Sequence, residues 1–433
     1  MNMNELTLPA DWQVKPIREA YTFTHKPRGL RISAEDAVAF LPMDAIPIGR
    51  VHVSAYEERL GGKLSSGTYI ENGDLLVAKI TPSFENGKQA IVDWQKPFGF
   101  ATTEVIPLQE IANVSDKFYL FHLLLHPEIR SDLAGKMEGT TGRQRLSKAV
   151  LGSRLIPLPP LPEQQKIAAV LGLVQRAIEQ QERLIALTTE LKKTLLHQLF
   201  TQGLRGEPQK ETEIGLVPES WNTTPLGACC DILSGSLSYT DFLKMESSDE
   251  DGAVECMGVK VSDMNLPGNE SRFVRANLSK RLPVAMAERK LIPSNTVVFP
   301  KRGAAIATNK KRLTTTWTVL DPNLIGVRAK DVVDPEFLFH WSQTFDLRKI
   351  TDPGTTPQLN KKDLVPVLLP LPKEIEEQRE IAHAISCVDN KLRFYQQKLS
   401  SFTDLFRTLL HQLMMAQIRV DQLDLSHMEL RRQ

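Results

Sequence analysis

EQQKIAAVLG, at residues 163–172, returns as EQREIAHAIS at residues 377–386, an offset of 214 residues along the chain. The same offset carries TLLHQL from 194–199 to 408–413, and 13 of the 38 positions aligned without a gap from residue 163 to residue 200 are identical. A long internal repeat of this kind determines the architecture of a whole chain. The sequence therefore predicts a duplication and a pseudo-twofold molecule.

A proline-spaced apolar strip stands before each copy of this motif. The strips read IPLPPLP at 156–162 and VPVLLPLP at 365–372. Proline lacks a backbone N–H and its ring clashes with the preceding helical turn, so neither strip can lie inside a helix. We expect an extended lead-in, with a long helix beginning after each strip.

Shorter matches link the beginnings and middles of the two halves. They are LPADW at 8–12 with VPESW at 217–221, GDLLVAKI at 73–80 with NTVVFPKR at 295–302, and Gly-Thr-Thr at 139–141 with Gly-Thr-Thr at 354–356. Residues 21–70 and 230–290 show no similarity. The ends of each half were thus kept while the middles diverged.

The residues after each motif predict two long paired helices. Apolar residues recur at alternating steps of four and three, which is typical of a coiled-coil seam. In the second copy the seam is Ile381, Ile385, Val388, Leu392, Tyr395, Leu399, Phe402, Phe406, Leu409 and Leu413. In the first copy it is Ile167, Leu171, Val174, Ile178, Gln181, Ile185, Thr188, Lys192, Leu195 and Leu199, with a looser centre at Gln181, Thr188 and Lys192. A helix of roughly 38 residues spans about 57 Å and needs a partner along its length. The simplest partner is the other copy, packed antiparallel.

Two mixed α/β segments alternate with these helices. Short β-branched runs broken by Gly, Pro and Asn precede helical patterns in both segments, which favours an α+β fold class. The Gly-rich, charged stretch at 200–215 is expected to link the halves. The expected divisions are a first globular domain at 1–155, a helical spacer at 156–204, a second globular domain at 205–364, a second helical spacer at 365–418 and a tail at 419–433.

Composition is that of an ordinary globular protein, with 41% hydrophobic and 24% charged residues among 433. No window approaches the ~18 apolar residues of a membrane span, and the opening MNMNELTLPADW lacks signal-peptide features, so we expect a soluble, cytoplasmic protein. The four cysteines form no pair of CxxC clips, which argues against structural zinc. The repeated histidines His197 and His411 lie outside the seam, and we expect them to face a partner surface rather than a metal.

Basic residues gather in two windows, although 53 Lys+Arg nearly balance 52 Asp+Glu. Residues 299–320 hold five basic residues and no acid, and residues 136–154 hold five against Glu138 alone. Lysine and arginine bind phosphates, while arginine, glutamine and asparagine read base edges. We expect DNA contacts from Lys79, Lys88, Thr140, Thr141, Arg143 and Arg145 in the first half, and from Lys301, Arg302, Lys310, Lys311, Arg312, Thr355, Thr356, Gln358, Lys361 and Lys362 in the second.

Enzyme motifs are missing from the sequence. It lacks the Asn/Asp-Pro-Pro-aromatic run and the Gly-rich cofactor loop of an amino-methyltransferase, the GxxxxGK[ST] phosphate loop and the GxSxG elbow. We therefore expect a non-catalytic chain that binds no cofactor or metal itself. Two alternatives stay open: a coiled-coil scaffold with two modules that bind no DNA, and a methyltransferase or nuclease acting alone, the latter suggested by the acids and the lysine at 71–79.

The doubled unit of a Pro-Leu-Pro strip, EQQKIA or EQREIA, and a long helix ending in LLHQLF or LLHQLM resembles the specificity subunit of type I restriction-modification systems. The resemblance covers nearly the whole chain, including Trp12, Trp221 and the Gly-Thr-Thr elements. It implies two target-recognition domains that each read one part of a split, asymmetric DNA site, separated by the two helices packed as an antiparallel coiled coil.

The resemblance also implies that catalysis belongs to partners. Two modification subunits would bring S-adenosylmethionine to methylate DNA, and restriction subunits would bring ATP- and Mg²⁺-dependent translocation and cleavage. The first Gly-Thr-Thr element continues with Arg143 and Arg145, whereas the second continues with Gln358. We therefore expect that DNA contacts do not carry over from one half to the other at this point.

Overall fold

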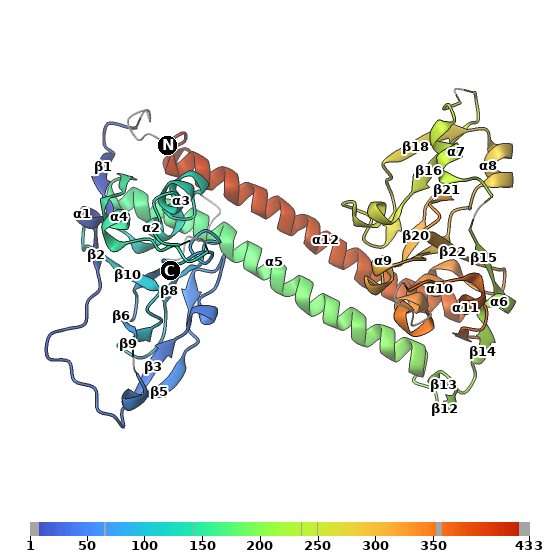
Figure 1. Ribbon diagram of the computed structural model, residues 1–433, viewed down its shortest axis with the longest axis horizontal. Coiled ribbons are helices and arrows are strands. Elements are labelled where there is room, and N and C mark those ends of the chain that lie inside the picture. The colour runs from blue at the N-terminus through green and yellow to red at the C-terminus, as the bar shows by residue number, and fades with distance from the viewer. Residues whose placement is uncertain are drawn as a thin grey trace. The chain divides into compact units, whose positions relative to one another are not determined.

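The computed structural model describes residues 8–423, except 65, 141, 235, 249 and 352–356 (Figure 1). The chain divides into two compact units. Unit 1 comprises Met1–Ile185 and Tyr395–Gln433, and unit 2 comprises Ala186–Phe394. The two long helices are shared between the units. Helix α5 (Leu161–Gln202) gives its first half to unit 1 and its second half to unit 2, and α12 (Ile375–Met414) does the reverse.

A five-stranded sheet forms the centre of each unit. The strand order is β2-β10-β7-β8-β4 in unit 1 and β15-β22-β19-β20-β17 in unit 2. In both sheets every neighbouring pair is antiparallel except the last, which is parallel. The strands are β2 Tyr21–Phe23, β10 Val105–Glu110, β7 Leu75–Ala78, β8 Gln89–Val92, β4 His52–Val53, β15 Cys230–Leu233, β22 Leu324–Ala329, β19 Thr296–Pro300, β20 Arg312–Thr314 and β17 Arg272–Phe273. The internal repeat predicted from the sequence is confirmed by this matching order.

The matched sequences GDLLVAKI and NTVVFPKR supply the central strands β7 and β19. Every residue of both strands is buried. Leu75 and Val77 of β7 join the core cluster that includes α2 and α5, while Leu76 joins the cluster on the other face of the sheet. A continuous apolar run is what burial of a strand on both faces requires.

A smaller sheet covers the second face of each central sheet. Its order is β5-β3-β9-β6 in unit 1 and β18-β16-β21 in unit 2. Strands β3 and β16 each pair antiparallel with one neighbour and parallel with the other. The strands are β5 Glu57–Leu60, β3 Ala37–Leu41, β9 Phe98–Ala101, β6 Thr68–Glu71, β18 Leu278–Leu282, β16 Val254–Val259 and β21 Trp317–Leu320. The middles of the two halves therefore keep a common topology although their sequences show no similarity.

Short helices cover the first face of each central sheet. Helices α2 (Lys117–Leu123) and α3 (Pro127–Ala134) lie in unit 1, and α10 (Pro335–Ser342) lies in unit 2. Asp116 and Asp334 cap α2 and α10 by accepting hydrogen bonds from backbone N–H groups of the first turn. The remaining α-helices described are α1 Ile17–Ala20, α4 Lys148–Ser153, α6 Leu226–Cys229, α7 Tyr239–Lys244, α8 Val284–Lys290, α9 Ala304–Ala307 and α11 Lys361–Leu364.

The proline-spaced strips are extended over part of their length, but α5 begins at Leu161, inside the first strip rather than after it, because proline is tolerated in the first turn of a helix. Strand β11 (Leu155–Leu158) pairs antiparallel with β1 (Gln13–Pro16), and β23 (Leu368–Leu371) pairs antiparallel with β14 (Asn222–Pro225). Each two-stranded ribbon joins the opening of a half to the start of its long helix.

The stretch expected to be a linker at 200–215 is more ordered than its composition suggests. Helix α5 continues to Gln202, and Gly203 and Gly206 follow with φ of 65° and 61°. Strands β12 (Gln209–Thr212) and β13 (Gly215–Pro218) then form a hairpin. Its turn has Gly215 at φ 98°, a conformation that glycine adopts without a steric cost.

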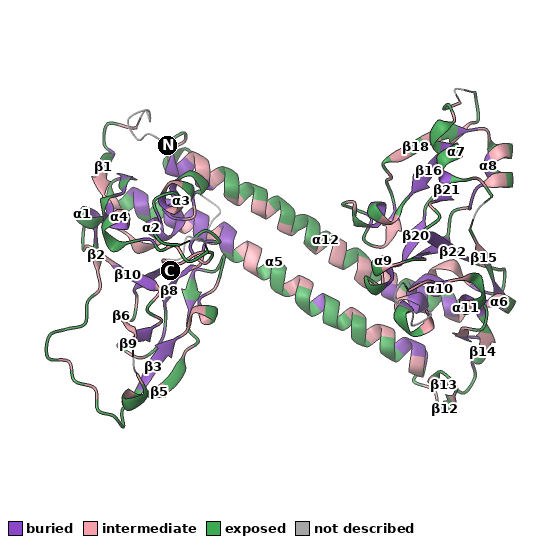
Figure 2. Cartoon of the chain, viewed as in Figure 1, coloured by how far each residue is buried: buried purple, intermediate pink, exposed green. Residues whose placement is uncertain are grey.

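The predicted seam positions of both helices face inward. None of the ten positions on either helix is exposed, whereas exposed residues predominate in the central turns of α5 and α12 (Figure 2). In unit 1, Leu171 shares a core with Leu410 and Leu413. In unit 2, Leu199 shares a core with Ile381 and Ile385. Of the polar residues at the centre of the first seam, Lys192 pairs with a carboxylate of α12, and Gln181 and Thr188 are buried. Gln181 Oε1 has no hydrogen-bond partner among the described residues, which is a cost to the packing there.

The chain after α12 packs against unit 1. Val420, at the start of the 3-10 turn Val420–Gln422, is fully buried in the unit 1 core. Arg419 donates hydrogen bonds of 2.7 to 3.0 Å to the carboxylates of Asp11 and Glu163. Lys166 pairs with Asp421 at 2.6 Å. The expected tail is thus held against unit 1 as far as it is described.

Within residues 8–423, apart from the nine positions left out, no helix has the length and apolarity to cross a membrane. Over the same residues, no three His, Cys, Asp or Glu side chains gather as the ligands of a metal ion would. Cys229, Cys230 and Cys256 are buried free thiols, and Cys387 is an exposed one.

Candidate nucleic-acid interface

The basic window of the first half lies beside the end of β7. The Leu146 N–H donates to the Lys79 carbonyl at 2.7 Å, and the Thr81 N–H donates to the Gln144 carbonyl at 3.0 Å. The Lys79 N–H in turn donates to the Glu104 carbonyl at 2.9 Å. Two predicted DNA-contact segments that are more than sixty residues apart in sequence, around Lys79 and around Arg143, are thereby brought together in what we call the unit 1 corner, residues 79–81 and 138–146.

Gly139 allows the loop of this corner to turn. It has φ of 136°, and a Cβ at this position would lie 2.7 Å from the Arg143 carbonyl oxygen. The Arg143 N–H donates to the Thr140 carbonyl at 2.9 Å, which closes the turn. Thr140 and Arg143 are exposed, while Thr141 lies outside the described residues. The loop therefore presents an arginine and a hydroxyl at its tip.

Arg145 has a different environment from Arg143. Its guanidinium binds both carboxylate oxygens of Glu104 at 2.9 Å, and this hydrogen bonding lowers the pKa of Glu104. The Arg145 side chain is 50% exposed. Lys79 and Lys88 are half-buried at the edges of the same region. Arg145 therefore anchors the loop to the sheet in addition to presenting charge.

Unit 2 repeats this corner with other side chains. The Leu359 N–H donates to the Lys301 carbonyl at 2.9 Å, as Leu146 does to Lys79, and the Lys301 N–H donates to the Asn323 carbonyl at 2.7 Å. Ile80 forms an isolated antiparallel β-bridge with Arg145 in unit 1, and Arg302 forms one with Gln358 in unit 2. Residues 301–303 and 357–362 thus form the unit 2 corner. The backbone positions therefore correspond between the halves although the residue types differ, and the expectation that DNA contacts do not carry over from one half to the other stays a prediction.

The unit 2 corner exposes three basic side chains. Arg302 follows β19, and Lys361 and Lys362 begin α11, whose first turn is capped by Asn360. Gln358 donates from Nε2 to Asn360 Oδ1 at 3.0 Å. Thr355 and Thr356 lie outside the described residues. Lysine at the position of Lys79 and Lys301 is common to both corners, whereas Arg145 is replaced by Gln358.

The prediction of DNA contacts by Lys311 and Arg312 is wrong in this fold. Lys311 is 1% exposed, and its Nζ donates to the Phe345 carbonyl at 2.6 Å and to Asn309 Oδ1 at 2.8 Å. Burial lowers the pKa of Lys311 to about 8. Arg312 is 8% exposed and donates to the carbonyls of Lys311 and Met264. Arg312 begins β20, an interior strand, and Lys311 directly precedes it. Counting charges along the sequence cannot show that these two side chains are buried.

Lys310 is only half-buried and hydrogen-bonds the Asn265 side chain. Its predicted DNA contact, like those of the exposed residues of the two corners, stays a prediction.

Sequence reasoning missed the residues that attach the helices to the sheets. The Trp12 indole donates to Glu163 at 3.0 Å and the Trp221 indole donates to Glu377 at 3.3 Å. Next to each glutamate, Gln164 and Gln378 are buried and bind backbone groups of the loop before α2 or α10. The repeated Glu-Gln pair was visible in the sequence, but its partners lie about 50 to 150 residues away and carry no local signal.

The repeated histidines differ from the expectation that both face a partner surface. His411 Nδ1 lies 3.0 Å from His126 Nε2 at the start of α3, and the rings stack with 5.3 Å between their centroids. The pKa of His126 is lowered to about 4, mainly because its ring is buried. His411 therefore has its partner inside unit 1, whereas His197 is exposed.

The tract at 71–79 does not form a nuclease site. Asp74 is fully buried, where it accepts hydrogen bonds from Thr24 Oγ1 at 2.7 Å and from the Glu71 N–H at 2.8 Å. Burial raises the pKa of Asp74 to about 6. Its carboxylate completes a turn before β7, while Lys79 follows the other end of that strand.

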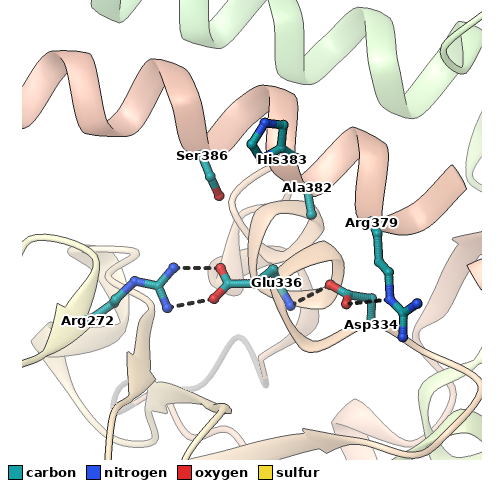
Figure 3. Close-up of a pocket in the computed structure, with 7 residues that line it drawn as sticks. All are labelled: Arg272, Asp334, Glu336, Arg379, Ala382, His383 and Ser386. Atoms are coloured by element: carbon teal, nitrogen blue, oxygen red, sulfur yellow. Dashed lines mark hydrogen bonds and ion pairs between the residues drawn. The ribbon is translucent and has the colours of Figure 1, made fainter. Parts of the chain in front are cut away.

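A polar cleft of about 290 Å³ lies beside α12 in unit 2 (Figure 3). Arg272 of β17 forms two 2.7 Å hydrogen bonds to Glu336 of α10, and Arg379 of α12 lies 3.9 Å from Asp334. His383 and Ser386 complete the wall on α12. Both carboxylates of the cleft are thus engaged by arginines, which leaves it without the open pair of acids that acid-base catalysis uses.

Known proteins share this doubled architecture. The family model for the type I restriction modification DNA specificity domain matches residues 10–189 and again residues 218–401. The type I restriction enzyme MjaVIII specificity subunit of Methanocaldococcus jannaschii is 22% identical over 435 residues, which cover 98% of this chain and 96% of that protein. The putative type I restriction enzyme MjaX specificity subunit of the same organism is 23% identical over 428 residues, covering 95% of each chain.

A solved structure shows the same fold. The crystal structure of the type I restriction-modification system S subunit from M. genitalium aligns with a TM-score of 0.59 at 15% identity, covering 96% of this chain and 98% of that one. The two ranges matched by the family model coincide with the two copies of the repeat and together span most of the chain. The chain therefore belongs to the family of type I restriction-modification DNA specificity subunits.

Proposed function

We propose that this chain is the DNA-recognition subunit of a type I restriction-modification complex, in which unit 1 and unit 2 each bind one part of a bipartite, asymmetric target. The observation that supports this most directly is the repeated corner. The same backbone pairing holds Lys79 and Lys301, while the neighbouring position carries Arg145 in one half and Gln358 in the other. The same backbone arrangement with different polar side chains is suited to the recognition of two half-sites that differ in base sequence.

The side chains of the corners have chemically distinct roles in this proposal. Lys79, Lys301, Lys361 and Lys362 carry point charges that bind phosphates and position the protein without reading sequence. Arg143 and Gln358 have the planar, two-pronged groups that recognise base edges, with arginine favouring guanine and glutamine favouring adenine. Arg145, tied to Glu104, supports the loop that presents Arg143.

The two long helices set the distance between the half-sites. We propose that α5 and α12 pair antiparallel as a coiled coil, which the inward burial of their seam positions supports. Deleting seven residues from each helix would shorten the pair by about 10 Å and keep the heptad phase, which corresponds to roughly three base pairs. Methylation mapping should then show a shorter spacer with unchanged half-sites. An unchanged spacer would contradict this role.

Exposed leucines on the helices suit protein partners. Leu187 is 59% exposed, Leu191 55% and Leu405 44%, and Leu191 and Leu405 occupy the same position in the two copies. Leu187 and Leu191 lie one helical turn apart and outside the seam, and we propose that they contribute to a surface for another protein. A surface that occurs once in each copy matches two modification subunits. These would supply S-adenosylmethionine and methyl transfer, and restriction subunits would supply ATP- and Mg²⁺-dependent cleavage, while this chain contributes recognition without a cofactor.

Methylation mapping in cells that carry this chain with its modification partner would define the target, and duplexes of that target then test the corners. In titrations at several salt concentrations, Arg143→Ala should weaken cognate binding by about 1 to 3 kcal/mol and relax one base of the first half-site. Lys361→Ala with Lys362→Ala should weaken cognate and random duplexes alike and reduce the salt slope by about two.

Arg18→Ala and Arg289→Ala are matched controls, because both arginines are exposed and lie outside the corners. Cognate affinity that survived all the corner substitutions would contradict the assignment of these residues. Binding with no dependence on DNA sequence, even with the modification partner present, would favour the scaffold alternative instead.

A further inference from the structure

A buried charged cluster lies where α5, α10 and α12 meet in unit 2. Lys192 Nζ of α5 lies 2.6 Å from Asp389 Oδ1 of α12, with the two side chains 22% and 12% exposed. Ser386 Oγ, one turn earlier on α12, lies 2.9 Å from His340 Nε2 of α10. His340 Nδ1 lies 3.9 Å from Asp389 Oδ2, and its side chain is 1% exposed. We call these four residues the charged node.

Within the node, Asp389 is neutralised by Lys192 rather than by His340. Burial, helped by the nearby positive charges of Lys192 and Arg272, lowers the pKa of His340 to about 3, so its ring is neutral. The separation of 3.9 Å between His340 and Asp389 is therefore a contact without an ion pair. Removal of Lys192 would leave the mostly buried Asp389 without its ion-pair partner, with only the arginines Arg272 and Arg393 of the adjoining cavity nearby.

The equivalent positions of unit 1 carry no charge. The offset of 214 residues places Phe406 where unit 2 has Lys192, Gln175 where it has Asp389, and Gly172 where it has Ser386. His122 takes the place of His340, because each ends a Leu-Phe-His run, at 120–122 and at 338–340. The centroid of the His122 ring lies 6.0 Å from that of Phe406. Gln175 donates from Nε2 to the Gly49 carbonyl at 2.8 Å. The same junction is thus ionic in one unit and neutral in the other.

We propose that the charged node is a pairing code, which commits each α5 to an α12 and opposes the pairing of like helices when two copies of the chain meet. Because α5 and α12 arose by duplication, their seams are alike enough for α5 to pair with a second α5. In the register of unit 2, that pairing would set Lys192 against Gln175, and pairing of α12 with a second α12 would set Asp389 against Phe406. Only α5 with α12 provides a counter-charge for both residues. A buried charge without its partner opposes association, as polar seam residues do in other coiled coils.

The inference rests on the proposed pairing of α5 with α12 but not on DNA recognition, so its test needs no DNA. The full-length variant Lys192→Phe with Asp389→Gln gives unit 2 the residues of unit 1. After unfolding and refolding, this variant should form species of about twice the 48.7 kDa chain mass, in a fraction about tenfold or more above that of the wild type. Light scattering after size-exclusion chromatography measures that fraction.

Charge exchange provides the second arm. Lys192→Asp alone and Asp389→Lys alone should each lower the melting temperature, and the two together should restore it. An equal mixture of the two single variants, refolded together, should give two-chain complexes, because the substituted α5 of one chain then meets the substituted α12 of the other. Gly203 and Gly206 lie after α5, at the connection where such an exchange would open.

Lys193→Asp, at an exposed neighbour of Lys192, is the control and should change neither the melting temperature nor the mass. The proposal is overturned if the Lys192→Phe, Asp389→Gln variant folds and stays single-chain as the wild type does. It is also overturned if the double charge exchange is no more stable than either single variant, or if the mixture remains single-chain. DNA binding by the wild type is measured separately, so failure of the pairing code leaves the recognition role untouched.

Discussion

The two buried glutamines that begin the long helices give a sharp test of how each unit is held together. Gln164 accepts a hydrogen bond from the Asp116 N–H at 2.9 Å and donates to the carbonyls of Val114 at 3.0 Å and Pro159 at 2.8 Å. Gln378 does the same in unit 2, with the Asp334 N–H at 2.8 Å and the carbonyls of Val332 at 3.1 Å and Pro372 at 3.2 Å. Each amide joins the start of its helix to the loop before α2 or α10.

Replacing either glutamine by alanine removes the side-chain partner of one N–H and two carbonyls, of which the bonds to Pro159 and Pro372 are buried and the others are part-buried. Each lost hydrogen bond costs about 1 kcal/mol or more when the remaining group stays buried, so Gln164→Ala should destabilise unit 1 by about 3 kcal/mol. Gln378→Ala should destabilise unit 2 to the same extent. Glutamate in place of either glutamine should be no better, because a carboxylate cannot donate to the two carbonyls.

Hydrogen exchange read by mass spectrometry resolves the two units separately. A loss of 3 kcal/mol corresponds to a roughly 100-fold faster exchange in β1, β11 and α2 for Gln164→Ala, and in β14, β23 and α10 for Gln378→Ala. Gln165→Ala is the matched control, since Gln165 is the exposed neighbour and its loss should stay within about 0.5 kcal/mol. The reasoning is refuted if Gln164→Ala behaves like Gln165→Ala.

Three further predictions concern pH, the unit 1 corner and the C-terminal segment. Burial lowers the pKa values of His122 and His340 to about 3, so the unfolded chain takes up protons first as pH falls through about 6.5, and each histidine should cost about 2 kcal/mol of stability by pH 5. In unit 1, Asp74 has a pKa raised to about 6 and takes up a proton in the folded state, which offsets part of this loss. Urea unfolding at pH 8 and at pH 5 measures the effect. Unit 2 should be less stable at pH 5, and an unchanged stability would contradict the neutral state of His340. Gly139→Ala should distort the loop at a cost of about 1 to 3 kcal/mol and abolish the DNA contacts of Arg143. Gly142→Ala is strained by its φ of 79° but meets no atom at its Cβ, so it should bind DNA more strongly than Gly139→Ala in the same titration. Arg419→Ala should release the segment after α12, so limited proteolysis should cut it faster than in Arg407→Ala, whose ion pair with Asp404 is exposed.

Much of this fold follows from local features of the sequence. The repeated Glu-Gln motif, the proline-spaced strips and the seam predicted two long helices with extended lead-ins, because proline geometry and helical periodicity act within a few residues. The match of GDLLVAKI with NTVVFPKR located the central strands for the same reason, since strands buried on both faces read as continuous apolar runs.

The rest depends on contacts that join distant parts of the chain. The smaller sheets in the divergent middles were not predicted, because β3 pairs with β9 about sixty residues later and neither strand specifies its partner alone. Lys311 was predicted to contact DNA because it lies in a basic stretch of sequence, and the number of charges in a stretch does not show which of its side chains are buried. The corners could be predicted only in part. Lys79 and Arg143 were both predicted to contact DNA, but the backbone hydrogen bonds that bring their segments together form only in the folded chain.

The hydrogen bonds that attach each sheet domain to its helix involve few side chains of that domain. Gln164 and Gln378 bind only peptide groups, which every amino acid carries, and the indoles of Trp12 and Trp221 donate to the adjacent glutamates. Domain residues that neither pack against the helix nor take part in these hydrogen bonds can change without weakening the attachment. A different sheet domain that offered the same peptide groups and an equivalent tryptophan could therefore attach to the same end of the helix.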